Sequence, residues 1–177
     1  MSRKYLTIVA AAIVCLLAAA ILPYQAANAG GRTTSASVLA VSDGDTLSVM
    51  AGRKREKVRL IGIDAPELGQ SPWGSRARAY LRELVAGSGN SVALEFDVEK
   101  RDQYGRLLAY AWTRDNRLIN LEMLRNGYAV LYTFSPNVKY VEQLREAQRY
   151  ARENGLNVWG RNGLREMPRD YRRTHPR

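Results

Sequence analysis

A series of short segments in which apolar and polar residues alternate constrains the fold of this sequence more than any other feature. Alternation with a period of two is typical of half-buried β-strands, and it is clearest over Thr46 to Val49 and Ser91 to Val98. Further strand-like segments lie at residues 38–41, 57–63, 107–113 and 128–132. Apolar residues at helical spacing occupy 75–86, 118–126 and 138–154. This order predicts a small closed antiparallel barrel with helices packed on it.

The first 29 residues have the pattern of a secretory signal peptide. Arg3 and Lys4 precede an uncharged, mainly apolar run from Thr7 to Leu22, and Ala27 to Ala29 fits the small-x-small cleavage pattern. The run is shorter than the roughly 20 residues that span a bilayer, although a tilted or interface-anchored helix can be this short. We therefore expect a secreted or periplasmic protein, with an uncleaved membrane anchor as the alternative.

The rest of the chain is expected to contain one folded domain. Residues 30–36 are polar and without periodicity, which predicts a flexible leader. The strands and helices occupy residues 37–160. Residues 161–177 are rich in arginine and are predicted to form a solvent-exposed basic tail.

Cysteine and histidine are almost absent from the chain, and this limits the possible chemistry. The single cysteine, Cys15, lies inside the signal segment, and the single histidine, His175, is the third residue from the end. A disulfide framework and a thiol nucleophile need cysteine, which the mature chain lacks, and a histidine-based zinc site or a Ser-His-Asp triad would depend on one histidine in an arginine-rich tail. Catalysis would therefore depend on carboxylates, arginines, backbone groups and a metal that prefers oxygen ligands.

The chain carries a formal net charge of +10. Such a charge favours a polyanionic partner, and arginine, which is much more frequent here than lysine, binds phosphate oxygens through two parallel hydrogen bonds. Charge alone leaves nucleic acid, a membrane surface and simple solubility as possible explanations.

Three acidic residues lie where strands begin or end rather than on exposed helix faces. Asp45 follows a glycine turn at the start of a strand, and Asp64 and Glu67 flank Ala65-Pro66 at the end of another. If these residues converge within one barrel, their charges repel each other unless a cation binds between them. Oxygen ligands without histidine or cysteine favour Ca²⁺ or Mg²⁺. Each residue taken singly could instead be a turn former or a cap.

Two arginines complement the acidic residues. Arg59 lies in an otherwise apolar strand, and Arg106 ends the turn at Tyr104-Gly105. An arginine in a core strand is costly unless it is paired, although Arg59 could also face outward. Cationic groups of this kind stabilise the charge that develops on a phosphoryl group during phosphodiester cleavage.

Four segments in order resemble the signatures of the thermonuclease (staphylococcal nuclease) family, and the similarity extends from about Ser37 to Gly160. The segments are Asp43–Thr46, Arg59–Glu67, Asp102–Tyr110 and Leu156–Trp159. The resemblance implies a five-stranded Greek-key OB-fold barrel with about three packed helices. It also implies a monomeric, secreted, Ca²⁺-dependent endonuclease without a stable protein partner. Such an enzyme cleaves single-stranded DNA and RNA, and also double-stranded DNA, leaving 3′-phosphate ends.

The resemblance also implies a metal site and a catalytic carboxylate. The carboxylates of Asp45 and Asp64 and the backbone carbonyl of Ala65 would bind Ca²⁺, and Glu67 would activate or orient the attacking water. Many family members have threonine where this chain has Ala65, so a side-chain hydroxyl near the metal is missing.

By the same resemblance, Arg59 and Arg106 would bind the scissile phosphate, and Arg106 would assist the leaving oxygen. Tyr104 and Tyr132 would line the nucleotide pocket, where aromatic stacking accepts any base. Ordinary barrel packing is an equally plausible role for both tyrosines. A non-catalytic nucleic-acid-binding OB-fold module is the alternative function, but binding alone would not need acidic residues that repel a polyanion.

Overall fold

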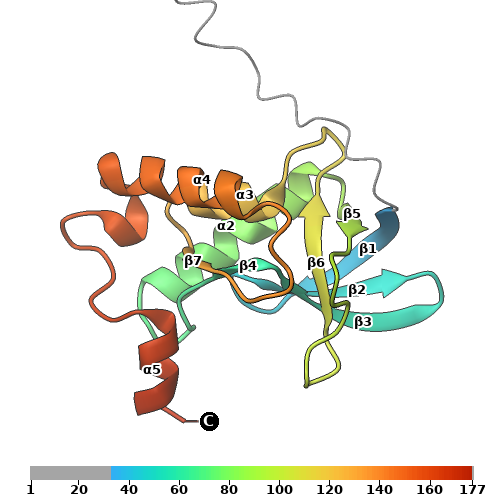
Figure 1. Ribbon diagram of the computed structural model, residues 1–177, viewed down its shortest axis with the longest axis horizontal. Coiled ribbons are helices and arrows are strands. Elements are labelled where there is room, and N and C mark those ends of the chain that lie inside the picture. Colours follow the sequence, from blue (N-terminus) through green and yellow to red (C-terminus); the bar gives the residue numbers. More distant parts are fainter. Residues whose placement is uncertain (1–32, 177) are drawn as a thin grey trace, which may run out of the picture. The chain divides into compact units, whose positions relative to one another are not determined.

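The computed structural model describes residues 33–176, so the predicted signal peptide at 1–29 lies outside the described residues. The described chain forms a closed barrel in which the strands are ordered β1-β2-β3-β6-β5 (Figure 1). The barrel strands are β1 (Thr33–Val41), β2 (Thr46–Ala51), β3 (Lys54–Leu60), β5 (Ser91–Glu95) and β6 (Leu107–Trp112). The predicted five-stranded OB-fold barrel is therefore confirmed.

A short ladder and several helices complete the domain. The ladder pairs β4 (Gly62–Asp64) with β7 (Val130–Tyr132). The helices are α2 (Trp73–Gly87), α3 (Ile119–Arg125), α4 (Val141–Glu153), the 3₁₀ turn η1 (Asn157–Trp159) and α5 (Pro168–Thr174). No helix within residues 33–176 has the length and hydropathy of a membrane span.

The strand pairs of the barrel are antiparallel except for one. β3 pairs with β6 in parallel, with Arg59 opposite Leu108, so the expectation of an entirely antiparallel barrel was wrong. The chain leaves β3 through β4 and α2 and returns through β5, which pairs antiparallel with both β1 and β6. Because β6 is antiparallel to β5, it runs parallel to β3, and its pairing with β3 closes the barrel.

The core of the barrel is filled by alternate residues of its strands. Leu47 and Val49 of β2 and Val58 and Leu60 of β3 are buried. Because successive side chains of a strand point to opposite faces, the residue between Val58 and Leu60 faces out of the barrel. Arg59 therefore projects from the outer face of β3, which agrees with the second of the two orientations considered for it, the outward-facing one.

The strand predicted over residues 57–63 breaks at Ile61. Gly62 has φ +79°, a left-handed backbone conformation that glycine adopts without strain. The buried Asn120 holds this break, because its Nδ2 donates to the Ile61 carbonyl at 2.7 Å and its Oδ1 accepts from the Ala111 N–H at 2.9 Å. The chain then turns into β4, and Asp64 comes to the end of that short strand.

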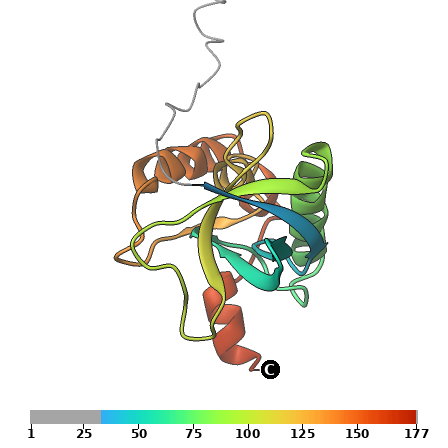
Figure 2. The same ribbon diagram turned by 90° about the vertical axis from the view of Figure 1, so that its right-hand side faces the viewer.

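Both segments that flank the predicted domain contain more structure than expected. Residues 33–36, assigned to the flexible leader, form the start of β1 and pair with β5, because β5 needs a partner on its open edge. Within 161–177, the predicted solvent-exposed tail, α5 begins at Pro168, a residue favoured in the first turn of a helix. Figures 1 and 2 show α5 at one end of the domain, apart from the other helices.

We predict that Asn120→Ala lowers the free energy of unfolding by about 2 kcal/mol, because it leaves a buried N–H and a buried carbonyl without partners. Denaturant unfolding followed by circular dichroism measures this change. Asn154→Ala is the matched control, since Asn154 makes its side-chain hydrogen bond to Tyr150 at an exposed position and should cost less than about 0.5 kcal/mol. Equal losses in the two variants would contradict the role of Asn120.

Candidate active site

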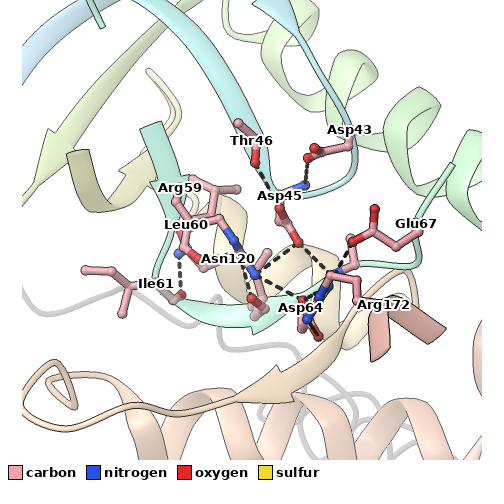
Figure 3. Close-up of polar contacts among 12 residues, drawn as sticks. Asp43, Asp45, Thr46, Arg59, Leu60, Ile61, Asp64, Glu67, Asn120 and Arg172 are labelled. Atoms are coloured by element: carbon pink, nitrogen blue, oxygen red, sulfur yellow. Dashed lines mark hydrogen bonds and ion pairs between the residues drawn. The ribbon is translucent and has the colours of Figure 1, made fainter. Parts of the chain in front are cut away.

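Asp45, Asp64 and Arg59 come together at one end of the barrel (Figure 3). Asp45 immediately precedes β2, Asp64 ends β4, and Arg59 lies near the end of β3. Arg59 is the register partner of Thr46, and the Leu60 N–H donates to the Asp45 carbonyl at 2.9 Å. The convergence expected from the sequence therefore follows from the pairing of β2 with β3 and from the turn into β4.

Arg59 bridges the two aspartates. Its Nη2 lies 3.2 Å from Asp45 Oδ2 and 3.1 Å from Asp64 Oδ1. Its Nη1 donates to the Leu60 carbonyl at 3.0 Å and to the Ile63 carbonyl at 2.8 Å. The side chains of Arg59, Asp45 and Asp64 are only 14%, 9% and 2% exposed. Charges buried to this extent are tolerated only when they are paired and hydrogen-bonded, so the three side chains form one interdependent unit.

The turn before Asp45 packs tightly against the loop after Asp64. A Cβ on Gly44 would lie 2.5 Å from the Cβ of Ala65 and 2.7 Å from that of Ala77, so no larger residue fits there without movement. The Ala65 N–H donates to Asp45 Oδ2 at 2.8 Å, and the Thr46 hydroxyl donates to Asp45 Oδ1 at 3.0 Å. These bonds fix both oxygens of the Asp45 carboxylate.

Burial makes the charged forms of this cluster costly. It raises the pKa of Asp64, an effect that hydrogen bonding to Arg172 and the charge of Arg59 oppose. Burial, together with the negative charge of Asp45, also raises the pKa of Asp43 to about 6. A site whose carboxylates are this close and this poorly solvated favours a bound cation.

Glu67 lies on the loop that follows Asp64, with its side chain 19% exposed. Gln70 closes this loop, because its Oε1 accepts from the Glu67 N–H at 2.9 Å and its own N–H donates to the Glu67 carbonyl at 2.8 Å. A Cβ on Gly74 would come within 2.0 Å of the Glu67 carbonyl oxygen. The start of α2 therefore packs directly on the backbone that carries Glu67.

Arg172 of α5 also belongs to the site, although residues 161–177 were predicted to form a solvent-exposed tail. Its Nη1 donates to Asp64 Oδ1 at 3.0 Å and to Glu67 Oε1 at 2.9 Å, and its Nη2 donates to Asp64 Oδ2 at 2.8 Å. These hydrogen bonds raise its pKa further above its ordinary value. An arginine among several in a basic tail carries no signal that separates it from its neighbours, so only the docking of α5 identifies it.

The remaining predicted residues lie on surface elements, and their hydrogen-bond, ring and strand partners are outside the cluster. Arg106 precedes β6, and its Nε lies 2.7 Å from Asp102 Oδ2. Its guanidinium stacks on Tyr104 at 5.6 Å from the ring centroid. Tyr104 is 75% exposed, so it does not pack inside the barrel. Tyr132 ends β7 opposite Gly62 and is partly exposed.

A divalent cation at this site would have oxygen donors from two carboxylates. In the described part of the chain, no group of three or more histidine, cysteine, aspartate or glutamate side chains is close enough to hold a metal. Asp45, Asp64 and the Ala65 carbonyl nevertheless make a donor set that consists entirely of oxygen, which suits Ca²⁺ or Mg²⁺ with water completing the coordination. The donor chemistry fits a hard cation, provided that the Asp64 oxygens are released from Arg172.

Comparison with known proteins identifies the family. The sequence matches the staphylococcal nuclease homologue family over residues 57–161. It is 35% identical to the thermonuclease of Staphylococcus intermedius over 144 residues, which cover 78% of this chain and 84% of that protein. It is 36% identical over 128 residues to the endonuclease YncB of Bacillus subtilis, covering 68% of this chain and 59% of that protein. The resemblance seen in the sequence is thus confirmed: the chain belongs to the staphylococcal nuclease homologue family.

Proposed function

We propose that this protein is a Ca²⁺-dependent endonuclease that acts outside the cytoplasm, hydrolyses DNA and RNA, and leaves 3′-phosphate ends. Phosphodiester hydrolysis is the activity named for its relatives, which include a thermonuclease and an endonuclease. The observation that carries the proposal is the pair of buried aspartates bridged by Arg59 beside Glu67. Export rests on residues 1–29 alone, and N-terminal sequencing of the processed protein tests it, with Gly30 as the expected first residue.

Asp45, Asp64 and the Ala65 carbonyl would hold the cation, which would supply positive charge to the phosphoryl oxygens. Their oxygen-only chemistry and their burial support this assignment. Asp45 is held by the Ala65 N–H and by Thr46, so one carboxylate is oriented in advance. Preorganised charge of this kind lowers the barrier because little rearrangement is needed during the reaction.

Glu67 would orient the attacking water and accept its proton. Its carboxylate and that of Asp64 share one partner, Arg172, and so lie within a few ångströms of each other. Water attack on phosphorus from this side would expel the 5′ oxygen. Hydrogen bonds to Gln70 keep the loop of Glu67 closed, which supports a fixed position for the base.

Arg59 and Arg106 would stabilise the phosphate. Backbone carbonyls hold Nη1 of Arg59, while Asp102 holds Nε of Arg106 and orients its guanidinium. Arg106 is 30% exposed and Arg59 14%, so Arg106 is the more accessible of the two to the leaving oxygen.

The outer face of the β2–β3 hairpin supports a nucleic-acid substrate. Arg55, Lys57 and Arg59 alternate along β3, so they share one face of the strand, and Arg55 and Lys57 are exposed. This row of cations leads from the hairpin tip to the aspartates. The exposed rings of Tyr104 and Tyr132 would stack on bases, which favours single-stranded segments and tolerates any sequence.

We predict that the protein cleaves single-stranded DNA in Ca²⁺ and that a chelator abolishes cleavage. Glu67→Gln should reduce turnover roughly 100- to 10,000-fold, because the variant cannot accept the proton of the attacking water. The rate at which fragments appear measures the effects of the chelator and of the substitution, and analysis of the fragment ends identifies the 3′-phosphates. Glu142→Gln is the matched control, because Glu142 is an exposed carboxylate paired with Arg145 on α4. Calcium-independent binding without cleavage would leave only the role of a binding module.

A second prediction concerns Arg106. Arg106→Ala should lower turnover at least about a hundredfold while the denaturation midpoint stays close to that of the parent protein. Arg117→Ala is its control, since Arg117 also binds an aspartate, Asp115, through Nε but lies on an exposed turn. A variant of Arg106 that unfolds, or that cleaves at the normal rate, would exclude a catalytic role.

A third prediction tests the row of cations on β3. In the Glu67→Gln background, Arg55→Ala combined with Lys57→Ala should make the salt dependence of single-stranded DNA binding shallower. The slope of log K against log salt should change by about 1.4, because each lost phosphate contact removes about 0.7. Arg145→Ala with Arg149→Ala, on α4, should leave the slope unchanged. Fluorescence anisotropy over a range of salt concentrations measures the slope, and an unchanged slope in the β3 variant would place the substrate elsewhere.

A further inference from the structure

The C-terminal helix α5 docks on the loop that carries Glu67. The Tyr171 hydroxyl packs against Gly69, where a Cβ would lie only 2.4 Å from it. Gln70 is buried, and its Nε2 donates to the Glu166 carbonyl at 2.8 Å. The segment that contains α5 is therefore attached to residues 69 and 70, directly beside the proposed base.

This docking places Arg172 on the Asp64 oxygen atoms that a metal would use and on one oxygen of the proposed base. Arg172 binds both Asp64 oxygens, at 3.0 and 2.8 Å, and one Glu67 oxygen at 2.9 Å (Figure 3). Two parallel N–H···O bonds between a guanidinium and a carboxylate are among the stronger and more directional ion pairs in proteins. The Asp64 side chain is only 2% exposed, so few other positions around it remain open to a ligand.

We propose that α5 is an autoinhibitory latch, in which Arg172 competes with the divalent cation for Asp64 and at the same time occupies the proposed base, Glu67. The inference rests on the proposed function, in which Asp64 is a metal ligand. Asp64 already binds the guanidinium groups of both Arg59 and Arg172. A divalent cation at Asp64 would add a third positive group beside them, and these charges repel in a poorly solvated site. Cation binding must therefore displace Arg172, and by linkage the docking of Arg172 must weaken cation binding by the same factor.

The second arginine of the site behaves differently. Arg59 lies on a barrel strand, and its Nη1 is bound to two backbone carbonyls, so it stays in place when ligands change. Arg172 lies on a seven-residue helix, a length at which a helix is unstable without tertiary contacts. That helix also lies beyond residues 57–161, the part that matches the family. The strand pairings of the described barrel do not involve α5, so release of the latch would leave those pairings in place.

Calorimetric titration of Ca²⁺ into the full chain tests the competition. Arg172→Ala should tighten Ca²⁺ binding about tenfold, within the roughly 5- to 150-fold range of coupled sites. Arg173→Ala is the matched control. It removes the same charge from the next residue of α5, whose side chain is 78% exposed and lies 3.5 Å from Asp170, and it should leave the affinity almost unchanged. Arg172→Lys keeps the charge but loses the paired hydrogen bonds, so it should give an intermediate affinity.

The outcomes separate the latch from the proposed function. If Arg172→Ala binds Ca²⁺ no more tightly than the parent protein while cleavage remains calcium-dependent, the latch is overturned and the nuclease assignment stands. Equal tightening in Arg172→Ala and Arg173→Ala would also overturn it, since general electrostatics would then explain the effect. If neither the parent nor any variant binds Ca²⁺, the calcium assignment fails and the latch fails with it.

The reciprocal effect is measured on the parent protein without any substitution. Ca²⁺ should accelerate tryptic cleavage after Arg165, Arg169, Arg172 and Arg173, because release of Arg172 weakens the docking of α5. Mass spectrometry of the fragments identifies these cuts, and Mg²⁺ in place of Ca²⁺ tests the choice of ion. Cleavage in this segment at the same rate with and without either ion would overturn release of the helix.

Discussion

The ion pair that Arg59 makes with Asp45 and Asp64 is the constraint on which the rest of the site depends. Asp45 comes from the turn before β2 and Asp64 from the end of β4, and carboxylates buried to this extent need a charged partner. The guanidinium satisfies both of them while two carbonyls at the break between β3 and β4 hold it. The same break, fixed by Asn120, brings Asp64 to the place where it meets Asp45. Packing and catalytic geometry therefore depend on the same few bonds.

Local sequence signals marked the residues of this cluster as unusual, but the resemblance to the nuclease family was needed to assign them to one site. Asp45 and Asp64 stand next to turn residues at strand ends, and Arg59 interrupts an apolar strand, so each is unusual within its own segment. The break at Ile61 could not be predicted in the same way, because it depends on Asn120, 59 residues further along the chain. The parallel pairing of β3 with β6 likewise depends on the path of the chain and not on the pattern of either strand.

Arg172 shows a second limit of prediction from sequence. Composition correctly describes residues 161–177 as basic, and a basic segment is usually solvated. The position of α5 is decided by two contacts that composition cannot reveal. Tyr171 packs beside Gly69, and the Gln70 side chain donates a hydrogen bond to the carbonyl of Glu166. An excess of arginine beside a site rich in carboxylates offers several possible partners, and the geometry of α5 selects one of them.

The charge distribution explains how an acidic cluster can serve a polyanionic substrate. The chain has a net charge of +10, and the exposed cations of β3 lie on the outer face that leads to the aspartates. These cations attract a polyanion at long range, whereas the aspartates repel it only at short range. Exposed charges attract a phosphate chain over about one Debye length, roughly 8 Å in physiological salt. Inside the site, a phosphate can approach the carboxylates only when a cation neutralises them. Arg172 binds the same carboxylates while its helix packs on the Glu67 loop. In the proposed exchange, a divalent cation would add one unit of positive charge to the site and would also release the helix from this loop.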